Sequence, residues 1–275
     1  MSFLKLLDEF NLETSNKEES ERFFSRKDAL AKMSNYSKNF ALAALPFGAI
    51  AAFSKPANAQ STEDVVGVLN FALTLELLEA EYYNMGCEIG IIPDEDRAIF
   101  NVIQKHENAH VIFLQDTINS LGGTPIEKPE FDFTASGTFD PFNQYPQYLA
   151  LSQAFEDTGV RAYKGQAGNV QSSDQILTAA LRIHSVEARH AAEVRRLRTM
   201  RGLDDIEAWI TGDNRGSLPE QAQAVYNGEA NTTHAGVDAT TVTDISDEAV
   251  TEAWDEPLTM EEVNAIASLF IVPAQ

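Results

Sequence analysis

Two stretches of this sequence carry its strongest structural signal: IQKHENAHVIFL at residues 103–114 and IHSVEARHAAEV at residues 183–194. The first contains the motif Glu-x-x-His at Glu107 and His110, and the second contains it at Glu187 and His190. The apolar residues that flank the first motif have apolar counterparts beside the second motif, separated by the same number of positions as the two motifs are. A repeat at a fixed offset is typical of duplicated architecture.

The repeat extends upstream to two further glutamates. Glu76 precedes Glu107 by the same separation as Glu156 precedes Glu187. A tyrosine follows each upstream glutamate at equal spacing, at Tyr83 and Tyr163. We expect both rings to pack in the core with satisfied hydroxyl groups, in preference to a redox role. Each half of the repeat is then one helical hairpin.

Apolar residues recur three, four or seven positions apart in four segments, which predicts four helices. The first helix begins at Ser61 or Thr62 and ends at Gly86 or Gly90, and the second runs from Pro93-Asp94 to Gly122-Gly123. The third helix begins at Pro146 and ends at Gly165 and Gly168. The fourth helix begins at a capping-box pair, Ser172 with Gln175, and ends at Gly202. Residues 122–145 have no sustained period, and we expect them to cross the full length of the bundle. The predicted fold at residues 60–203 is an all-α four-helix bundle with a pseudo-twofold axis between its hairpins.

The repeated polar residues would be costly inside a bundle unless something compensated their charge. Residues three apart on a helix can aim a carboxylate and an imidazole at one point. The two motifs and the two upstream glutamates together supply four carboxylates and two imidazoles, whose four negative charges match two divalent cations. Oxygen and imidazole ligands suit iron, manganese or zinc. The predicted metal ligands are Glu76, Glu107, His110, Glu156, Glu187 and His190.

With these residues, the sequence resembles the ferritin-like superfamily, and more closely its branch of exported ferritin-like domain proteins. The flanking text is also similar, in LNFALTLE at residues 69–76, VEARH at 186–190 and WDEPLT at 254–259. The resemblance implies that Glu76 and Glu156 are single-glutamate ligands or bridges. It implies that the motif glutamates bridge or chelate the metals, and that each motif histidine binds one metal.

Other polar residues near the motifs have weaker signals. Glu79 shares the inward stripe of Glu76, but Gly159 occupies the equivalent position in the second half, so we interpret Glu79 as a neighbour of the ligands. We expect His106 and His184 to lie at the surface or beside the site, and His234 to lie in a loop.

Residues 1–59 read as a cleaved export signal. The apolar run at residues 40–53 is too short to span a bilayer as a helix, and an Ala-x-Ala site at residues 57–59 follows it. The stretch SRKDAL at residues 25–30 resembles a twin-arginine signal with lysine in its second position. We therefore expect a periplasmic or extracellular protein that begins near Gln60 and has no stable membrane span. An amphipathic N-terminal helix is the alternative.

The composition narrows the possible functions. The chain has 42 acidic and 20 basic residues among 275, a formal charge of −22, which argues against nucleic-acid binding. A hydrophobic content of 44% supports a packed core, and the single cysteine, Cys87, excludes a thiolate metal cluster. The charge is consistent with metal ions as partners, although solubility alone also explains it.

The C-terminal extension, residues 204–275, is predicted to contain short helices. Leu203–Ile210 is one candidate, and residues 227–247 read as a loop. Thr259 and Glu262 form a capping box that opens an apolar helix through Phe270. This helix could dock on the bundle or on a partner subunit of a homo-oligomer.

Three hypotheses about function follow. The first is a di-iron or di-manganese carboxylate oxidoreductase that acts on oxygen or peroxide, for example a ferroxidase. The second is a metal-binding stress-protection protein without turnover, which the resemblance implies because plant and fungal members of the exported branch are associated with desiccation or stress. The third is a structural or interaction module that the metal only stabilises. The residues leave open whether the protein is an enzyme.

Overall fold

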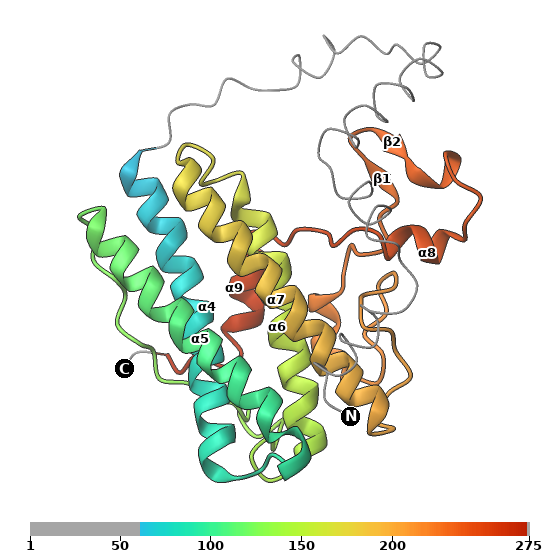
Figure 1. Ribbon diagram of the computed structural model, residues 1–275, viewed down its shortest axis with the longest axis horizontal. Coiled ribbons are helices and arrows are strands. Elements are labelled where there is room, and N and C mark those ends of the chain that lie inside the picture. The colour runs from blue at the N-terminus through green and yellow to red at the C-terminus, as the bar shows by residue number, and fades with distance from the viewer. Residues whose placement is uncertain (1–60, 274–275) are drawn as a thin grey trace, which may run out of the picture. The chain divides into compact units, whose positions relative to one another are not determined.

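The computed structural model describes residues 61–273, and the predicted export signal lies outside the described residues. Four long helices dominate it: α4 (Thr62–Ile89), α5 (Asp94–Ser120), α6 (Tyr145–Ala167) and α7 (Asp174–Met200). Helix α4 pairs with α5, and α6 pairs with α7, so that two hairpins pack together mainly through α4 and α6 (Figure 1). The predicted all-α bundle of two paired hairpins is confirmed. No helix among the described residues is both long enough and apolar enough to cross a bilayer.

Local sequence signals set the ends of these helices. The Ser61 side chain caps α4 as part of a capping box with Asp64, and Gly90 ends the helix with a φ of 79°, a conformation that favours glycine. Pro146 lies in the first turn of α6, as predicted. The predicted cap of α7 was wrong by one residue: Ser173, and not Ser172, accepts a hydrogen bond from the backbone of Ile176.

The long connection between α5 and α6 crosses the bundle from end to end. Near its start, the side chain of Asn70 on α4 bonds the backbone of residues 124 and 126. At its finish, the Tyr145 hydroxyl donates to Asp96 at the beginning of α5. The crossover also pairs with the C-terminal segment through a bridge between Phe131 and Ile271. Because of this crossing, α6 runs parallel to α5 and antiparallel to α4.

The C-terminal extension folds onto the α4/α6 side of the bundle. It contains the 3-10 helices η2 (Glu220–Val225) and η3 (Ala239–Thr241), the strands β1 (Thr233–His234) and β2 (Val237–Asp238), and the helices α8 (Asp247–Thr251) and α9 (Met260–Ala267). The capping box at Thr259 is present, and α9 ends before Phe270. The predicted helix at Leu203–Ile210 does not form, and His234 lies in a two-residue strand that pairs with β2, not in a loop.

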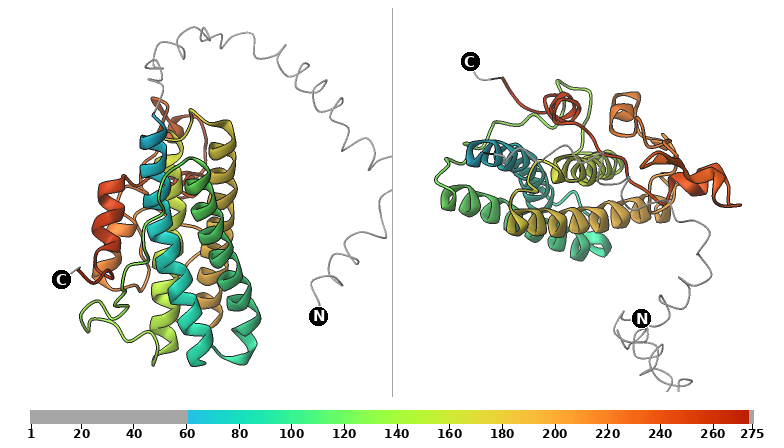
Figure 2. Two further views of the ribbon diagram at one scale, coloured as in Figure 1. Left: turned by 90° about the vertical axis from the view of Figure 1, so that its left-hand side faces the viewer. Right: turned by 90° about the horizontal axis from the view of Figure 1, so that it is seen from above.

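This arrangement explains an unequal pattern of burial. Figure 2 (right) shows α4 and α6 lying between α9 and the layer of α5 and α7. Helices α4 and α6 are therefore buried around most of their circumference, whereas α5 and α7 bury only one stripe. Arg161 on α6 illustrates the consequence: it is 1% exposed and pairs with Glu229 of the extension at 2.6 Å. A buried ion pair of this kind ties the extension to the bundle.

Candidate metal centre

All six predicted ligands meet in the middle of the bundle. They come from all four long helices: Glu76 from α4, Glu107 and His110 from α5, Glu156 from α6, and Glu187 and His190 from α7. Their oxygen and nitrogen atoms form two groups, in each of which one atom per residue lies within 4.8 Å of the others: Glu76, Glu107, His110 and Glu187 in the first, and Glu107, Glu156, Glu187 and His190 in the second. We call these six residues the Glu/His cluster. Because Glu107 and Glu187 belong to both groups, the two groups are adjacent.

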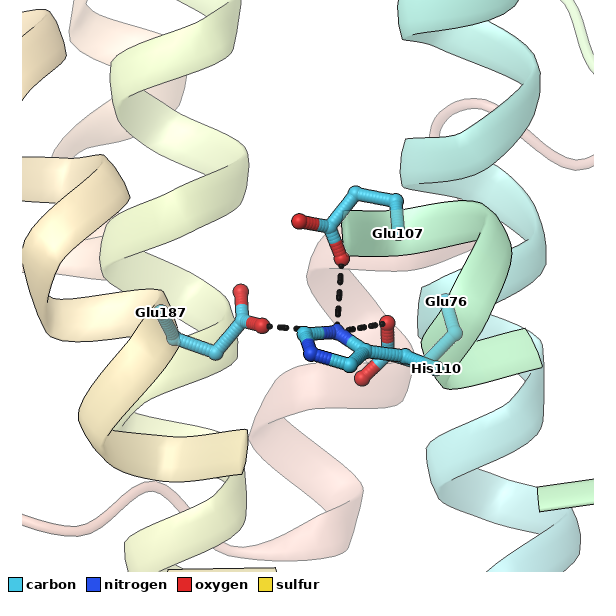
Figure 3. A group of neighbouring side chains, drawn as sticks. All are labelled: Glu76, Glu107, His110 and Glu187. Atoms are coloured by element: carbon cyan, nitrogen blue, oxygen red, sulfur yellow. Dashed lines mark hydrogen bonds and ion pairs between the residues drawn. The ribbon is translucent and has the colours of Figure 1, made fainter. Parts of the chain in front are cut away.

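In the first group, His110 lies at the centre of three carboxylates (Figure 3). Its Nδ1 atom is 3.1 Å from Oε2 of Glu76, 3.0 Å from Oε2 of Glu107 and 3.3 Å from Oε1 of Glu187. The three glutamates have no exposed surface, and the side chain of His110 is 12% exposed. One imidazole nitrogen carries a single hydrogen, so it cannot donate fully to three acceptors at once.

In the second group, the Nδ1 atom of His190 is 2.9 Å from Oε1 of Glu107 and 3.3 Å from Oε2 of Glu156. These contacts are close but do not have hydrogen-bond geometry. Nδ1 of His190, Oε1 of Glu107 and Oε2 of Glu156 have no hydrogen-bond partner among the described residues, and neither oxygen of Glu187 has one. Buried polar atoms are normally hydrogen-bonded, so this concentration of unpartnered donor atoms requires an explanation.

The two repeated tyrosines hold the cluster from opposite helices. The Tyr83 hydroxyl on α4 donates to Oε1 of Glu156 on α6 at 2.5 Å, and the Tyr163 hydroxyl on α6 donates to Oε1 of Glu76 on α4. Both rings are buried, as predicted. The spacing from each glutamate to its tyrosine is about two helical turns, so equal spacings on two antiparallel helices bring both pairs into register. The equal spacings were visible in the sequence repeat. Only the orientation of the helices shows that each tyrosine hydroxyl binds a glutamate of the other hairpin.

Glu79 lies beside the Glu/His cluster, and neither ligand group includes it. It is 3% exposed. A Cβ atom at Gly159 would be 3.0 Å from Oε2 of Glu187 and 3.3 Å from Oε1 of Glu79. The glycine on α6 therefore leaves the space that the carboxylate of Glu79 uses. This explains why the position that pairs with Glu79 in the repeat has no side chain.

The two additional histidines have different roles. Nδ1 of His106 is 2.9 Å from Nε2 of His190, and the rings stack with centroids 5.2 Å apart. His106 therefore contacts the side of His190 that faces away from the carboxylates. His184 donates from Nδ1 to the backbone carbonyl of Val160 at 2.9 Å, outside the cluster. His106 thus lies beside the site, one of the two places expected for it. The repeat gave no signal for its contact with His190, because Val186 occupies the equivalent position in the second half.

The electrostatics of the cluster reflect burial of charge. Burial raises the pKa of Glu76 to about 7, and it raises the pKa of Glu187 well above its ordinary value, with the charge of Glu107 adding to the effect. Burial also acts on Glu107, but the hydrogen bond from His110 and the nearby positive charges of both cluster histidines outweigh it and lower its pKa to about 2. At His190 the carboxylates of Glu156 and Glu107 outweigh burial and raise its pKa to about 11.

Without a metal, the cluster therefore balances its charge with protons. Burial also raises the pKa of Glu156, and both cluster histidines have a raised pKa, so the metal-free cluster favours bound protons. A divalent cation could replace those protons, because carboxylate oxygens and imidazole nitrogens are its usual ligands. The unpartnered atoms of Glu107, Glu156, Glu187 and His190 face the same volume, as the ligands of a metal ion would. The residues present thus fit a metal centre, and the Glu/His cluster can hold metal ions.

Comparison with known proteins is consistent with this geometry. A family profile described as the ferritin-like domain matches residues 64–200, from the first turn of α4 to the end of α7. No curated protein matches the chain. The matched residues contain all four long helices and the whole Glu/His cluster. Through this domain, the chain belongs to the ferritin-like superfamily.

Proposed function

We propose that the protein binds two divalent metal ions, most favourably iron, and uses them as an oxidoreductase that reduces oxygen or peroxide. The observation that carries the proposal is the convergence of four buried carboxylates and two imidazoles with unpartnered donor atoms. Four carboxylates neutralise two divalent ions, which resolves the cost of their burial. Bound ferrous ions would supply the electrons for the reduction.

The two ligand groups suggest how the chain divides its donors. Glu76 and His110 belong only to the first group, and Glu156 and His190 belong only to the second. Glu107 and Glu187 are shared, so we assign them to both ions. This division refines the roles that the family resemblance implies, since each ion receives one unshared carboxylate and one imidazole.

The surrounding residues orient these ligands. The hydroxyls of Tyr83 and Tyr163 each occupy one oxygen of an unshared glutamate, and the second oxygen of each glutamate faces a cluster histidine, where an ion would bind. His106 contacts Nε2 of His190 and so directs Nδ1 towards the carboxylates. Such supporting contacts commonly change metal affinity about 10- to 100-fold.

The proposal includes export. The signal predicted for residues 1–59 would deliver the bundle of residues 60–203 and the extension of residues 204–275 to the periplasm or the extracellular space. Sequencing the N-terminus of protein purified from its native compartment tests this part. A mature chain that begins near Gln60 supports it, and an intact Met1 contradicts it.

An anaerobic titration with ferrous ion, followed by addition of oxygen or hydrogen peroxide, tests the metal centre. We expect two ions per chain and consumption of one of the oxidants. Glu107→Ala should lose at least one ion, because Glu107 contacts both histidines. Glu193→Ala is the matched control, since Glu193 is on α7 in a partly exposed pair with Arg196.

The outcomes separate the hypotheses. Binding without consumption of either oxidant would favour a metal-binding protein without turnover. Binding of neither iron nor another divalent ion by the unmutated protein would contradict the metal centre itself.

A further inference from the structure

Three tyrosines form a continuous path from the Glu/His cluster to the surface of the bundle. Tyr83 donates its hydroxyl hydrogen to Glu156 at the cluster. Its ring centroid is 6.4 Å from that of Tyr148, and the Tyr148 centroid is 6.1 Å from that of Tyr145, with those two rings stacked. Tyr83 and Tyr148 are fully buried, whereas Tyr145 is only partly buried.

The two ends of this path have proton acceptors and the middle does not. Tyr145 donates to Oδ2 of Asp96 at 2.6 Å, and the same oxygen accepts a hydrogen bond from the exposed Arg201 at 2.7 Å. The buried hydroxyl of Tyr148 has no hydrogen-bond partner among the residues described. A phenol that loses an electron becomes a strong acid. A neutral phenoxyl radical can therefore form at Tyr83 and at Tyr145, where a carboxylate takes the proton, but not at Tyr148.

The backbone is shaped to hold Tyr148 between the other two rings. A Cβ atom at Gly86 on α4 would overlap Cε2, Cζ and Oη of Tyr148. The ring also stacks on Tyr82 with a centroid distance of 4.8 Å. The hydroxyl of Tyr82 donates to a backbone carbonyl, which is a poor proton acceptor. Tyr82 therefore packs against the path, but a neutral phenoxyl radical would not form on it.

Among the described residues, no equivalent path leads outward from Tyr163. Tyr163 is buried at the cluster like Tyr83, but its neighbours are aliphatic residues such as Leu73, Leu114 and Ile183. In the part of the chain that the structure describes, Tyr163 makes no ring–ring contact. The positions that match Tyr145 and Tyr148 in the first half of the repeat are Val65 and Val68.

From these contacts we infer that Tyr83, Tyr148 and Tyr145 relay single electrons between the Glu/His cluster and the bundle surface at the partly exposed Tyr145, a redox role for Tyr83 that the sequence did not favour. The inference rests on the proposed function, with peroxide as the oxidant. An ascorbate-like one-electron donor in solution is the reductant. The relay would let the protein reduce further peroxide after the metal ions have given up their electrons.

One hydrogen peroxide takes up two electrons and two protons and becomes two water molecules. For each electron, the O–H bond of Tyr145 breaks: the electron passes inward through Tyr148 and Tyr83, and the proton passes to Asp96. One ascorbate monoanion then donates an electron to the phenoxyl radical of Tyr145 and releases a proton, while the proton on Asp96 returns to the phenol. Two ascorbate monoanions thus supply both electrons and both protons.

Photo-oxidation of the metal-free protein tests the path independently of the metal centre. A bulky ruthenium polypyridyl oxidant with persulfate cannot enter the core, so it can oxidise a buried tyrosine only through a relay. We expect peptide mapping to find oxidised Tyr83 and unmodified Tyr163, although both are buried at the cluster. Tyr148→Phe should reduce oxidation of Tyr83 about tenfold or more, because phenylalanine is much harder to oxidise. This variant removes only an unpartnered hydroxyl, so we expect it to fold.

Tyr82→Phe is the matched control, since it changes a neighbouring ring of the same cluster, and oxidation of Tyr83 should persist in it. Equal oxidation of Tyr83 and Tyr163, or unchanged oxidation of Tyr83 in Tyr148→Phe, would overturn the relay. A second arm adds peroxide to iron-loaded protein and follows the phenoxyl signal by electron paramagnetic resonance. If that protein consumes neither peroxide nor oxygen, the proposed function fails, while the metal-free arm still decides whether the path conducts.

Discussion

The two hairpins place equivalent tyrosines at the Glu/His cluster but surround them differently. Tyr83 lies in an aromatic end of the bundle that also contains Phe100, Tyr145 and Tyr148. Tyr163 lies in an aliphatic end, next to a small cavity of about 30 Å³ lined by Leu114 and other apolar side chains. The two halves of the repeat thus have equivalent residues in contact with the Glu/His cluster, but different residues around those contacts.

The same contrast holds for the polar neighbours of the cluster. Glu79 has Gly159 as its counterpart, and His106 has Val186. Each pair puts a polar group on one side of the pseudo-twofold axis only. Two metal ions require similar ligand sets. The groups that control access to the cluster, or the transfer of protons or electrons to it, need not be symmetric. Four predictions test this division between a shared core and different surroundings.

The Glu/His cluster, which both hairpins share, should give the largest effect on stability. In metal-free protein, the pKa of Glu76 is raised from about 4.5 to about 7 and that of His190 from about 6.5 to about 11. Between the unfolded and folded pKa of each group, the folded state binds more protons than the unfolded state. The metal-free protein should therefore lose stability as the pH rises through these windows.

Metal ions displace those protons, so stabilisation by Mn²⁺ should grow with pH. At a free ion concentration of 1,000 times Kd, each site contributes about 4 kcal/mol to the free energy of unfolding. Thermal unfolding with and without Mn²⁺, from about pH 5 to about pH 8, measures the difference in Tm. A Tm difference that is independent of pH would contradict proton displacement at the cluster.

The aromatic end should be intolerant of added volume. Gly86→Ala places a methyl group inside the buried ring of Tyr148 and should lower the free energy of unfolding by about 1–3 kcal/mol. Gly67→Ala on the same helix has nothing within 4 Å and should instead raise it by about 0.5–1 kcal/mol, through helix propensity alone. Denaturant unfolding of both variants measures the difference. The same sign for both would show that Tyr148 moves aside easily.

The Glu79–Gly159 pair should affect metal affinity. Gly159→Ala brings a methyl group to 3.0 Å from Glu187 and should weaken binding of at least one ion about tenfold. Glu79→Ala alone should weaken binding much less, and combining the two changes should recover part of the loss because Glu79 then leaves the space. Competition titrations of the four proteins give the coupling energy. Loss of both ions in Glu79→Ala, with Glu76→Ala unaffected, would reverse our assignment on α4.

The helix caps should give the smallest effect. Ser61→Ala breaks a capping box and should lower the free energy of unfolding by about 1 kcal/mol. Ser173→Ala removes a longer hydrogen bond of 3.4 Å and should cost less. Ser172→Ala should have no measurable effect, since Ser172 does not cap α7. A larger loss for Ser172→Ala than for Ser173→Ala, measured by thermal unfolding, would restore the capping pair predicted from sequence.

The sequence alone identified the helices and brought the six cluster residues into one hypothesis. Helical periodicity is a local property, so inward stripes, capping residues and glycine stops can be read from neighbouring positions. The equal separations of Glu76 from Glu107 and of Glu156 from Glu187 also place both Glu-x-x-His motifs at matching heights, whatever the exact packing. This is why the structure brings together every residue of the predicted ligand set.

Features that depend on the pairing of distant surfaces could not be predicted. The bonds from Tyr83 to Glu156 and from Tyr163 to Glu76 require α4 and α6 to be antiparallel neighbours, which the crossover decides. The extension could be assigned to the bundle only once Arg161 was seen to pair with Glu229. The path from Tyr83 through Tyr148 joins residues of different hairpins, and no periodicity encodes that contact. Periodicity determines which face of a helix is buried, whereas tertiary packing determines which side chains that face meets.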